Sequence, residues 1–329
     1  MDKSTESIAI STRIRLARNY ADLPFPVIAG DEDAQEVVLR VTNALEGQDF
    51  RVIPMHTLEP TDRQVLVERH LVSMDLLQTP QRSALAINPD GSAAVMINEE
   101  DHLRIQAILP GLQLEPAFML ANQVDDQLET QGFAYDDTLG YLTSCPTNAG
   151  TGMRASVMMH LPALTMTGYM NTLAQMLSKV GLMVRGIYGE GSEALGGLYQ
   201  ISNQVTMGLT EEDILHNLAV AARQIIQKEE NVRNMQQGNK LEDRSWRALG
   251  ILTHARRLDT AEFMQLLSDL RLGIDMGYIT QVDVQTVNQL TTQGQVANLQ
   301  RMKSRELKPE ERDIERAELC RNTLKGASS

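Results

Sequence analysis

Cysteine is scarce in this sequence, which has only Cys145 and Cys320 among its 329 residues. The two lie far apart in dissimilar surroundings, and no Cys/His cluster has the spacing of a zinc site. This argues against a disulfide framework and against a cysteine-based metal centre. Any cysteine chemistry here is that of a single thiol.

Long apolar runs and excess positive charge are also lacking. No stretch approaches the length of a membrane span, and the first residues lead into no signal-peptide hydrophobic region, so we expect a cytoplasmic protein without a membrane partner. The formal net charge of -13 disfavours direct binding of nucleic acid. It favours encounters with cationic partners such as arginine-rich protein segments.

The hydrophobic periodicity changes along the chain. Up to about residue 210 it alternates between strands and helices, and Thr210 with the acidic turn after it then opens a run of helices only. Strands are predicted at 8–16, 92–97, 105–109, 184–188 and 198–207, and helices at 33–45, 61–71, 113–131, 161–180, 210–237, 243–258, 260–270, 282–292 and 310–324. We place a flexible tail at 1–7, a first domain at 8–230 and a helical domain at 231–329.

Three short segments carry groups suited to chemistry. The loop 145–154 combines a thiol, a turn-forming proline, two glycines and Arg154, which suits an anion held beside a reactive group. The alternative is a purely structural role, with a buried cysteine before a glycine turn. Arg13 and Arg15 project from one face of a strand. They form either a clamp for phosphate or a pair of solvated charges. The acidic run 99–101 is either a solvated turn or the mouth of a site in which crowded carboxylates raise one another's pKa.

These segments together resemble the phosphagen (guanidino) kinases. Cys145-Pro146-Thr147-Asn148-x-Gly150-Thr151-Gly152-x-Arg154 resembles the active-site motif of that family, and Asn98-Glu99-Glu100-Asp101-His102-x-Arg104 resembles its acidic loop. Arg13-Ile14-Arg15 and Arg185-Gly186-x-x-Gly189-Glu190 complete the set in the family's order. The resemblance implies an α+β fold, with an antiparallel β-sheet flanked by helices in the catalytic domain and an all-helical domain after it.

Within the family, the sequence is most similar to the bacterial protein arginine kinases. The resemblance starts almost at the first residues of the sequence, so we expect no N-terminal helical domain of the kind that encloses a small guanidino substrate. Arg312-Asp313-x-x-Arg316-Ala317 resembles the motif by which these kinases recognise phosphoarginine allosterically. Tyr188 stands where small-molecule phosphagen kinases have another arginine, a change that the protein-kinase branch shares. Ala149 replaces a larger apolar residue.

The resemblance also implies roles for individual residues. Transfer of the γ-phosphoryl group of ATP needs charge neutralisation and in-line positioning, and the acceptor guanidinium must lose a proton. Glu100 is the expected base, with Glu99 beside it. Glu190 would arrive on a mobile glycine loop, and Cys145 would act as a thiolate that aids electrostatically. Mg²⁺ would bind through ATP, with no protein ligand. The residues implied in ATP binding are Ser11, Thr12, Arg13, Ile14, Arg15, His70, Arg104, Arg154, Ala155, Ser156, Val157, Met158, Arg185, Gly186, Ile187, Tyr188, Gly189 and Glu190.

We therefore predict a kinase that phosphorylates arginine side chains of proteins. The resemblance implies a homodimer, protein substrates with exposed arginines, and as further partners a zinc-containing activator protein, a heat-shock repressor and a Clp-type protease that degrades marked proteins. Two alternatives stay open. One is a kinase for free arginine or a similar metabolite, and the other is an inactive adaptor that binds phosphoarginine.

Overall fold

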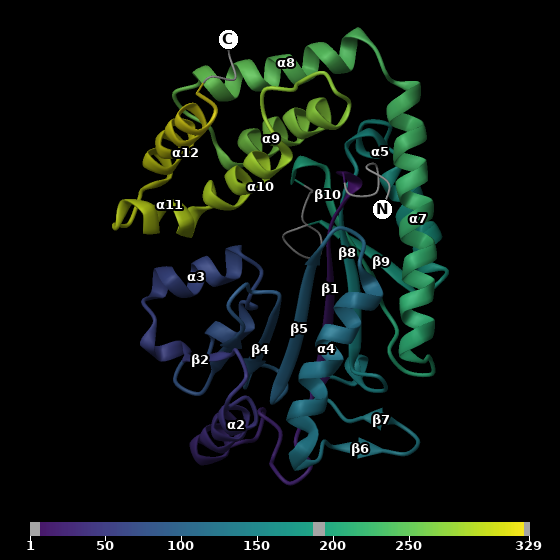
Figure 1. Ribbon diagram of the computed structural model, residues 1–329, viewed down its shortest axis with the longest axis vertical. Helices are drawn as coiled ribbons and strands as arrows, with labels where there is room; N and C mark the ends of the chain where they lie inside the picture. Colours follow the sequence, from purple (N-terminus) through teal and green to yellow (C-terminus); the bar gives the residue numbers. More distant parts are fainter. Residues whose placement is uncertain (1–6, 187–194, 326–329) are drawn as a thin grey trace.

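An eight-stranded antiparallel sheet is the centre of the molecule (Figure 1). We describe a computed structural model, in which residues 7–186 and 195–325 are described. The strand order is β2-β3-β4-β5-β1-β8-β10-β9. The strands are β1 (Ala9–Arg18), β2 (Arg51–Pro54), β3 (Ala84–Ile87), β4 (Ala93–Ile97), β5 (Leu103–Pro110), β8 (Met153–His160), β9 (Leu182–Gly186) and β10 (Leu198–Asn203), and β6 (Tyr135–Asp136) pairs with β7 (Gly140–Tyr141) as a separate hairpin.

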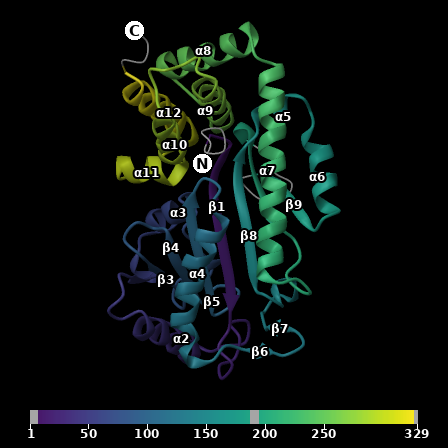
Figure 2. The same ribbon diagram turned by 45° about the vertical axis from the view of Figure 1, so that its right-hand side comes forward.

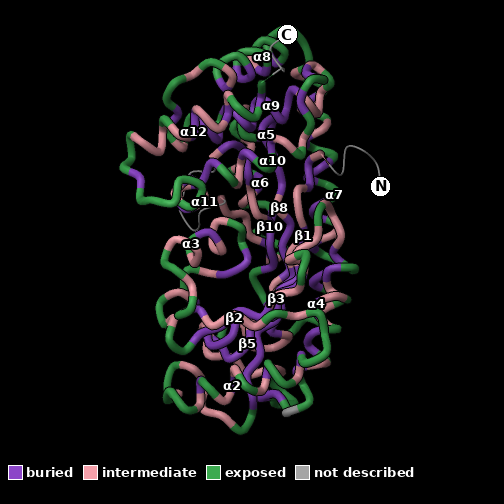
Figure 3. Tube along the Cα trace, turned by 60° about the vertical axis from the view of Figure 1, so that its left-hand side comes forward, coloured by how far each residue is buried: buried purple, intermediate pink, exposed green. Residues whose placement is uncertain are grey.

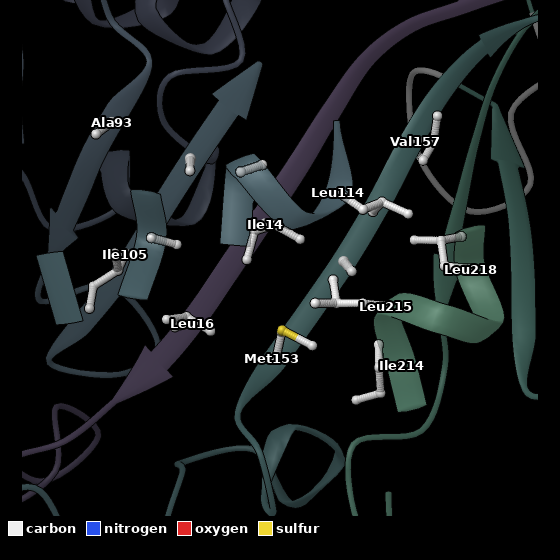
Figure 4. Packing of buried hydrophobic residues seen from close by; sticks show 14 of the residues in the cluster. Ile14, Leu16, Ala93, Ile105, Leu114, Met153, Val157, Ile214, Leu215 and Leu218 are labelled. Carbon is white, nitrogen blue, oxygen red and sulfur yellow. The ribbon is translucent and has the colours of Figure 1, made fainter. Parts of the chain in front are cut away.

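One face of the sheet packs against helices and forms the main core. Alternate residues such as Ile14, Leu16 and Val157 are fully buried there. They meet Leu114 of α4 and Leu218 of α7, as Figure 4 shows. Figure 2 shows α4 and α7 lying across this face. The helices of this part are α2 (Asp31–Ala44), α3 (Pro60–Glu68), α4 (Leu114–Leu128), α5 (Pro162–Met166), α6 (Met170–Ser178) and α7 (Glu211–Met235).

The C-terminal part is helical and lies beyond one end of the sheet (Figure 1). It consists of α8 (Asn239–His254), α9 (Thr260–Asp275), α10 (Val284–Gln293), α11 (Val296–Lys303) and α12 (Pro309–Thr323). These helices have a hydrophobic core of their own around Phe263 and Leu270. Figure 3 shows the buried residues running along the sheet and continuing between α9 and α10. The α+β fold predicted from the sequence is thereby confirmed. No helix within the described ranges is both long and apolar enough to cross a membrane.

The two parts meet at several places. α9 packs against residues 195–197 and the nearby end of β8, where Ser268 is 2.8 Å from the His160 ring. α11 packs against α3 of the catalytic part. Ser7, which the sequence placed in a tail, accepts a hydrogen bond from Arg271 of α9 through its backbone oxygen. The helical part is therefore held directly against the catalytic sheet.

The structure corrects several expected elements. The helix expected at 161–180 is two helices, because Gly168 adopts a positive φ of 69° between α5 and α6. On α6, Met176 is 54% exposed, although the methionines of the expected helix 161–180 suggested a buried face. α7 continues through Asn231 and ends at Met235, so the chain leaves the helix after the expected domain boundary. β2, β3, β6, β7, β8 and α11 were not predicted. Most of them are too short to show a full hydrophobic pattern, and β8 is buried along most of its length, so it shows no clear alternation.

Candidate active site

The second face of the sheet carries a row of arginines. Arg13 and Arg15 of β1 share this face because side chains alternate along a strand. Arg15 is paired across the sheet with Arg154 of β8, and Arg104 of β5 is paired with Ala17. Arg185 of β9 is opposite Gln200 of β10, whose side chain accepts a hydrogen bond of 3.1 Å from Arg13. Five arginines from four strands thus face one side.

A cavity of about 370 Å³ opens on this face. Four of the five arginines line it, together with the carboxylate of Glu100 and the thiol of Cys145. The full lining is Arg15, Ala17, Asp75, Glu100, Arg104, Cys145, Thr147, Asn148, Gly152, Arg154 and Arg185. The structure therefore brings the predicted cationic and acidic residues to one place.

The arginines repel one another. Burial, with the charges of Arg104 and Arg154, lowers the pKa of Arg13 to about 10. Burial, with the charges of Arg13, Arg104 and Arg154, also lowers the pKa of Arg15. Burial with Arg185 and Arg104 lowers that of Arg154. Such a concentration of like charge is unfavourable by itself and becomes favourable when an anion binds. Guanidinium groups suit phosphate oxygens in particular, because they donate two parallel hydrogen bonds.

The acidic loop provides two carboxylates in different environments. The Glu99 side chain is fully buried, and its Oε1 accepts hydrogen bonds from Arg104 at 2.7 Å and from Ser73. The Glu100 side chain is 39% exposed, and its Oε2 accepts hydrogen bonds from Arg104 at 3.1 Å and Asn148 at 3.3 Å. Burial raises the pKa of Glu100, opposed by Arg104 and reinforced by Asp101 and Glu99. Glu100 is therefore suited to accept a proton from a bound ligand, while Glu99 orients Arg104.

The third acidic residue has a structural role. Asp101 is fully buried, and its Oδ1 accepts hydrogen bonds from the Asn19 side chain at 2.7 Å and the Ser144 backbone amide at 2.6 Å. It thereby connects the acidic loop to the residue before Cys145. The interpretation of this loop as a solvated turn is wrong, because two of its three carboxylates are buried against distant segments.

The loop around Cys145 is shaped by glycines that contact the protein itself. Gly150 has φ 102°, and a Cβ there would come within 2.4 Å of the Thr206 carbonyl oxygen. Gly152 has φ 64°, and its Cβ would meet the Ala17 oxygen at 2.7 Å. These glycines were expected to admit a ligand, and they chiefly allow close packing before Arg154. Cys145 is half-buried, with its Sγ 3.0 Å from Thr147 Oγ1.

The other predicted nucleotide-binding residues divide between the two faces. Ser11, Ser156 and Met158 share the face of the arginines. The side chains of Thr12, Ile14, Ala155 and Val157 lie buried on the opposite face, where they cannot contact a nucleotide. His70 follows α3 with φ 59°, is exposed, and lines a second cavity with Ser11 and Met158. Gly186 ends β9, whereas Ile187, Tyr188, Gly189 and Glu190 lie outside the described residues.

The predicted phosphoarginine motif lies on α12. Arg316 is 1% exposed and donates hydrogen bonds to the Gly294 oxygen at 2.9 Å, the Leu258 oxygen at 2.6 Å, Thr260 Oγ1 at 3.2 Å and Asp313 Oδ1 at 3.1 Å. Ala317 is fully buried, and Arg312 and Asp313 are partly exposed. Arg312 and Asp313 are therefore accessible to a ligand, while Arg316 joins α12 to α9 and α10.

Sequence reasoning missed several residues of the site. Ser73, Asp75 and Gln200 come from segments without a motif, and only the structure identifies them. Ser73 donates a hydrogen bond to Glu99, Asp75 lines the cavity, and Gln200 accepts a hydrogen bond from Arg13. Among the described residues, no group of three or more His, Cys, Asp or Glu side chains is arranged to hold a metal ion.

Family models match nearly all of this chain. Residues 33–232 match the ATP:guanido phosphotransferase, C-terminal catalytic domain, and residues 238–329 match the protein-arginine kinase McsB C-terminal domain. A protein-arginine kinase of Caldanaerobacter subterraneus is 49% identical, with 97% of each chain covered. One of Brevibacillus brevis is 47% identical, with 98% of this chain and 93% of the relative covered.

Solved structures show the same catalytic fold. A lombricine kinase matches with a TM-score of 0.62 and 24% identity, covering 70% of this chain and 69% of its own. A duplicated taurocyamine kinase from Schistosoma mansoni with bound transition state analog components matches with a TM-score of 0.64 and 25% identity, covering 78% of this chain and 40% of its own.

Proposed function

This chain belongs to the ATP:guanido phosphotransferases and, among them, to the protein-arginine kinases, and on that premise we propose that it phosphorylates arginine side chains of proteins with ATP. The observation that carries the proposal is the cavity in which Arg15, Arg104, Arg154 and Arg185 surround Glu100 and Cys145. It joins an anion-binding surface to a carboxylate of raised pKa.

Each group has a distinct part in the proposed transfer. The arginines neutralise the phosphates and hold the γ-phosphoryl group in line with the acceptor nitrogen. Glu100 orients the acceptor guanidinium and takes its proton as the N–P bond forms and the bond to the β-phosphate oxygen breaks. Glu99 and Ser73 hold Arg104 in place. By resemblance, Cys145 is assigned an electrostatic role beside the guanidinium, and Glu190 is assigned the second carboxylate.

Mg²⁺ fits this proposal as part of the nucleotide. The cavity is rich in arginine, and Glu99 and Glu100 are paired with Arg104, so the hard oxygen ligands of a magnesium ion would come from the phosphates and water. When bound, the ion supplies further neutralisation of the phosphate charge.

The regulatory part of the proposal rests on the family resemblance. We propose a homodimer in the cytoplasm that acts in the stress response, with a zinc-containing activator protein, a heat-shock repressor and a Clp-type protease as partners. Arg312 and Asp313 would bind phosphoarginine as an allosteric ligand, with Arg316 and Ala317 supporting them. The net charge of -13 supports arginine-rich protein substrates.

One incubation tests the acceptor. The protein receives Mg-ATP with either an unfolded arginine-rich protein or free arginine, and phosphorus NMR with non-acidic mass spectrometry locates the phosphate. Acid-labile phosphate on protein arginine, absent with Glu100→Ala, is the expected result. Phosphate on free arginine alone would make the protein a metabolite kinase, and phosphate on neither would favour the adaptor.

A further inference from the structure

One carboxylate in the lining of the arginine-rich cavity has no partner. Asp75 lines this cavity together with Glu100, and its side chain makes no hydrogen bond or ion pair within residues 7–186 and 195–325. Glu100, by contrast, pairs with Arg104 at 3.1 Å and accepts a hydrogen bond from Asn148. Asp75 is exposed, so it presents an unneutralised negative charge to whatever enters the cavity.

The short helix that carries Asp75 is firmly anchored. This 3-10 helix, η2 (Asp75–Leu77), buries the side chain of Leu76 completely in a small hydrophobic cluster. Just before it, Ser73 Oγ accepts a hydrogen bond of 3.2 Å from the Leu76 amide and donates one to Glu99. The turn is therefore tied to the acidic loop, and Asp75 is held at a constant place beside it.

The charge of Asp75 suits the acceptor and not the nucleotide. In the proposed function the four arginines of the lining hold the triphosphate, and a carboxylate near phosphate oxygens is repulsive, whereas one near a cation is attractive. Burial is the main cause of the raised pKa of Glu100, and the charge of Asp75 adds to it. Asp75 is therefore close to Glu100, on the side of the cavity that receives the guanidinium.

An acceptor arginine in a protein brings its neighbours to this place. Its guanidinium must reach Glu100 inside the cavity, while the backbone that carries it stays at the opening. Residues of an extended chain are about 3.3 Å apart along the chain, so side chains one or two positions away come within reach of the exposed Asp75. A lysine there would meet an unpaired carboxylate, and a glutamate would meet a like charge.

We propose that Asp75 selects protein substrates in which a positively charged side chain lies next to the acceptor arginine, by pairing with that neighbouring side chain. This inference rests on the function proposed above and specifies its substrate class. Asp75 is thereby a residue that determines specificity, while Glu100 keeps the transfer of the proton.

A set of matched peptides tests the preference in the unmodified protein. Each peptide has one arginine, blocked ends, and a lysine, glutamine or glutamate at one of the two positions on either side. The release of ADP gives kcat/KM, and non-acidic mass spectrometry confirms phosphoarginine. At one position or more, we expect lysine to exceed glutamate by about three- to fivefold, mainly through KM. The difference should shrink with added salt.

Two substitutions with the same change of charge separate a local effect from that of the whole protein. The net charge of -13 attracts cations in general, and Asp75→Asn and Asp49→Asn each remove one negative charge. Asp49 is exposed and lies outside the cavity lining. Asp75→Asn should bring the ratio of lysine to glutamate peptides close to one, and Asp75→Lys should invert it. Asp49→Asn should keep the ratio of the unmodified protein.

The outcomes separate this inference from the proposed function. Equal rates for all peptides in the unmodified protein would overturn the inference alone, as would a preference that survives Asp75→Asn. A uniform loss of kcat/KM in Asp75→Asn, whatever residue flanks the arginine, would place Asp75 on the acceptor guanidinium itself and would also overturn it. If the unmodified protein phosphorylated no peptide, the proposed function would fail and the inference with it.

Discussion

Glu68 of α3 accepts hydrogen bonds from both amides of Asn298 in α11, at 2.9 Å from the backbone nitrogen and 2.7 Å from the side chain. Its other oxygen accepts a bond of 2.7 Å from the Ala297 amide. A catalytic-domain carboxylate thus caps the first turn of a C-terminal helix, where unpaired amides and the helix dipole favour negative charge. His70 follows two residues later and lines a cavity with Ser11 and Met158.

Removal of this cap should loosen the contact between the domains. We expect Glu68→Ala to lower the free energy of unfolding by about 1–2 kcal/mol and to raise the KM for ATP. Chemical denaturation and steady-state kinetics measure the two effects. Glu59→Ala is the matched control at the N-cap of the same helix, because Glu59 is exposed and its side chain makes no cap hydrogen bond. Equal behaviour of both variants would contradict a docking role for Glu68.

Glu100 should determine the acid limb of the pH profile. Burial raises its pKa, and the base must be ionised to act, so activity should fall with decreasing pH at a higher pH than an ordinary glutamate would give. The profile of kcat/KM for the protein substrate measures this. Glu100→Gln should lower kcat by about 10²–10⁴-fold and remove the acid limb of the pH profile. A retained limb would assign the titration to another group.

Asp125 should be essential for stability. Arg18 is 1% exposed, donates to Asp125 at 2.8 Å and to the Thr151 oxygen at 3.0 Å, and lies 3.6 Å from the centre of the Tyr141 ring. Burial raises the pKa of Asp125 despite Arg18, so the intact pair adds little net stability. Loss of one partner leaves a buried charge, and Asp125→Ala should cost about 3–5 kcal/mol.

Urea denaturation measures this cost, with Asp126→Ala as the control because Asp126 is exposed one position along α4. Since Arg18 also holds the Thr151 carbonyl beside Gly152, the surviving folded fraction should show a higher KM for ATP. A loss below about 1 kcal/mol, the usual limit for an exposed pair, would contradict the buried-charge argument.

Local patterns predicted the parts of the site that depend on a single strand. Alternation alone placed Arg13 and Arg15 on one face, and the strand predicted at 184–188 contains Arg185. Arg104 and Arg154 were expected in loops, and the structure places them at the starts of β5 and β8. The burial of Glu99 and Asp101 could not be predicted, because it depends on contacts with Ser73 and Ser144 from distant segments.

The same limit applies to the glycine loop and to the helical domain. Gly150 and Gly152 suggested a ligand-binding loop, and only the fold shows that Thr206 and Ala17 occupy the space beside them. Likewise, the helices of the C-terminal part could be located from periodicity, yet nothing local indicates that α9 meets the end of β8.

Arg312 and Arg316 should respond differently to substitution, although both belong to one motif. Arg316 donates hydrogen bonds to four acceptors, which lie just before α9, at its first residue, just after α10 and on α12. Arg316→Ala should therefore lower the melting temperature whatever ligand is present. Arg312 is partly exposed and has no such network in the described structure. Arg312→Ala should therefore keep the melting temperature and abolish stimulation of activity by a phosphoarginine peptide.

The ratio of stimulated to unstimulated rate, measured beside the melting curve, separates ligand binding from folding. Lys303→Ala offers a control. Lys303 of α11 pairs with Glu315 of α12, and it lies outside the phosphoarginine motif. If Arg312→Ala were stimulated as strongly as the unmodified protein, phosphoarginine would have to act elsewhere. Arg316 would then be a structural residue alone, a role that the four hydrogen bonds of its buried guanidinium already explain.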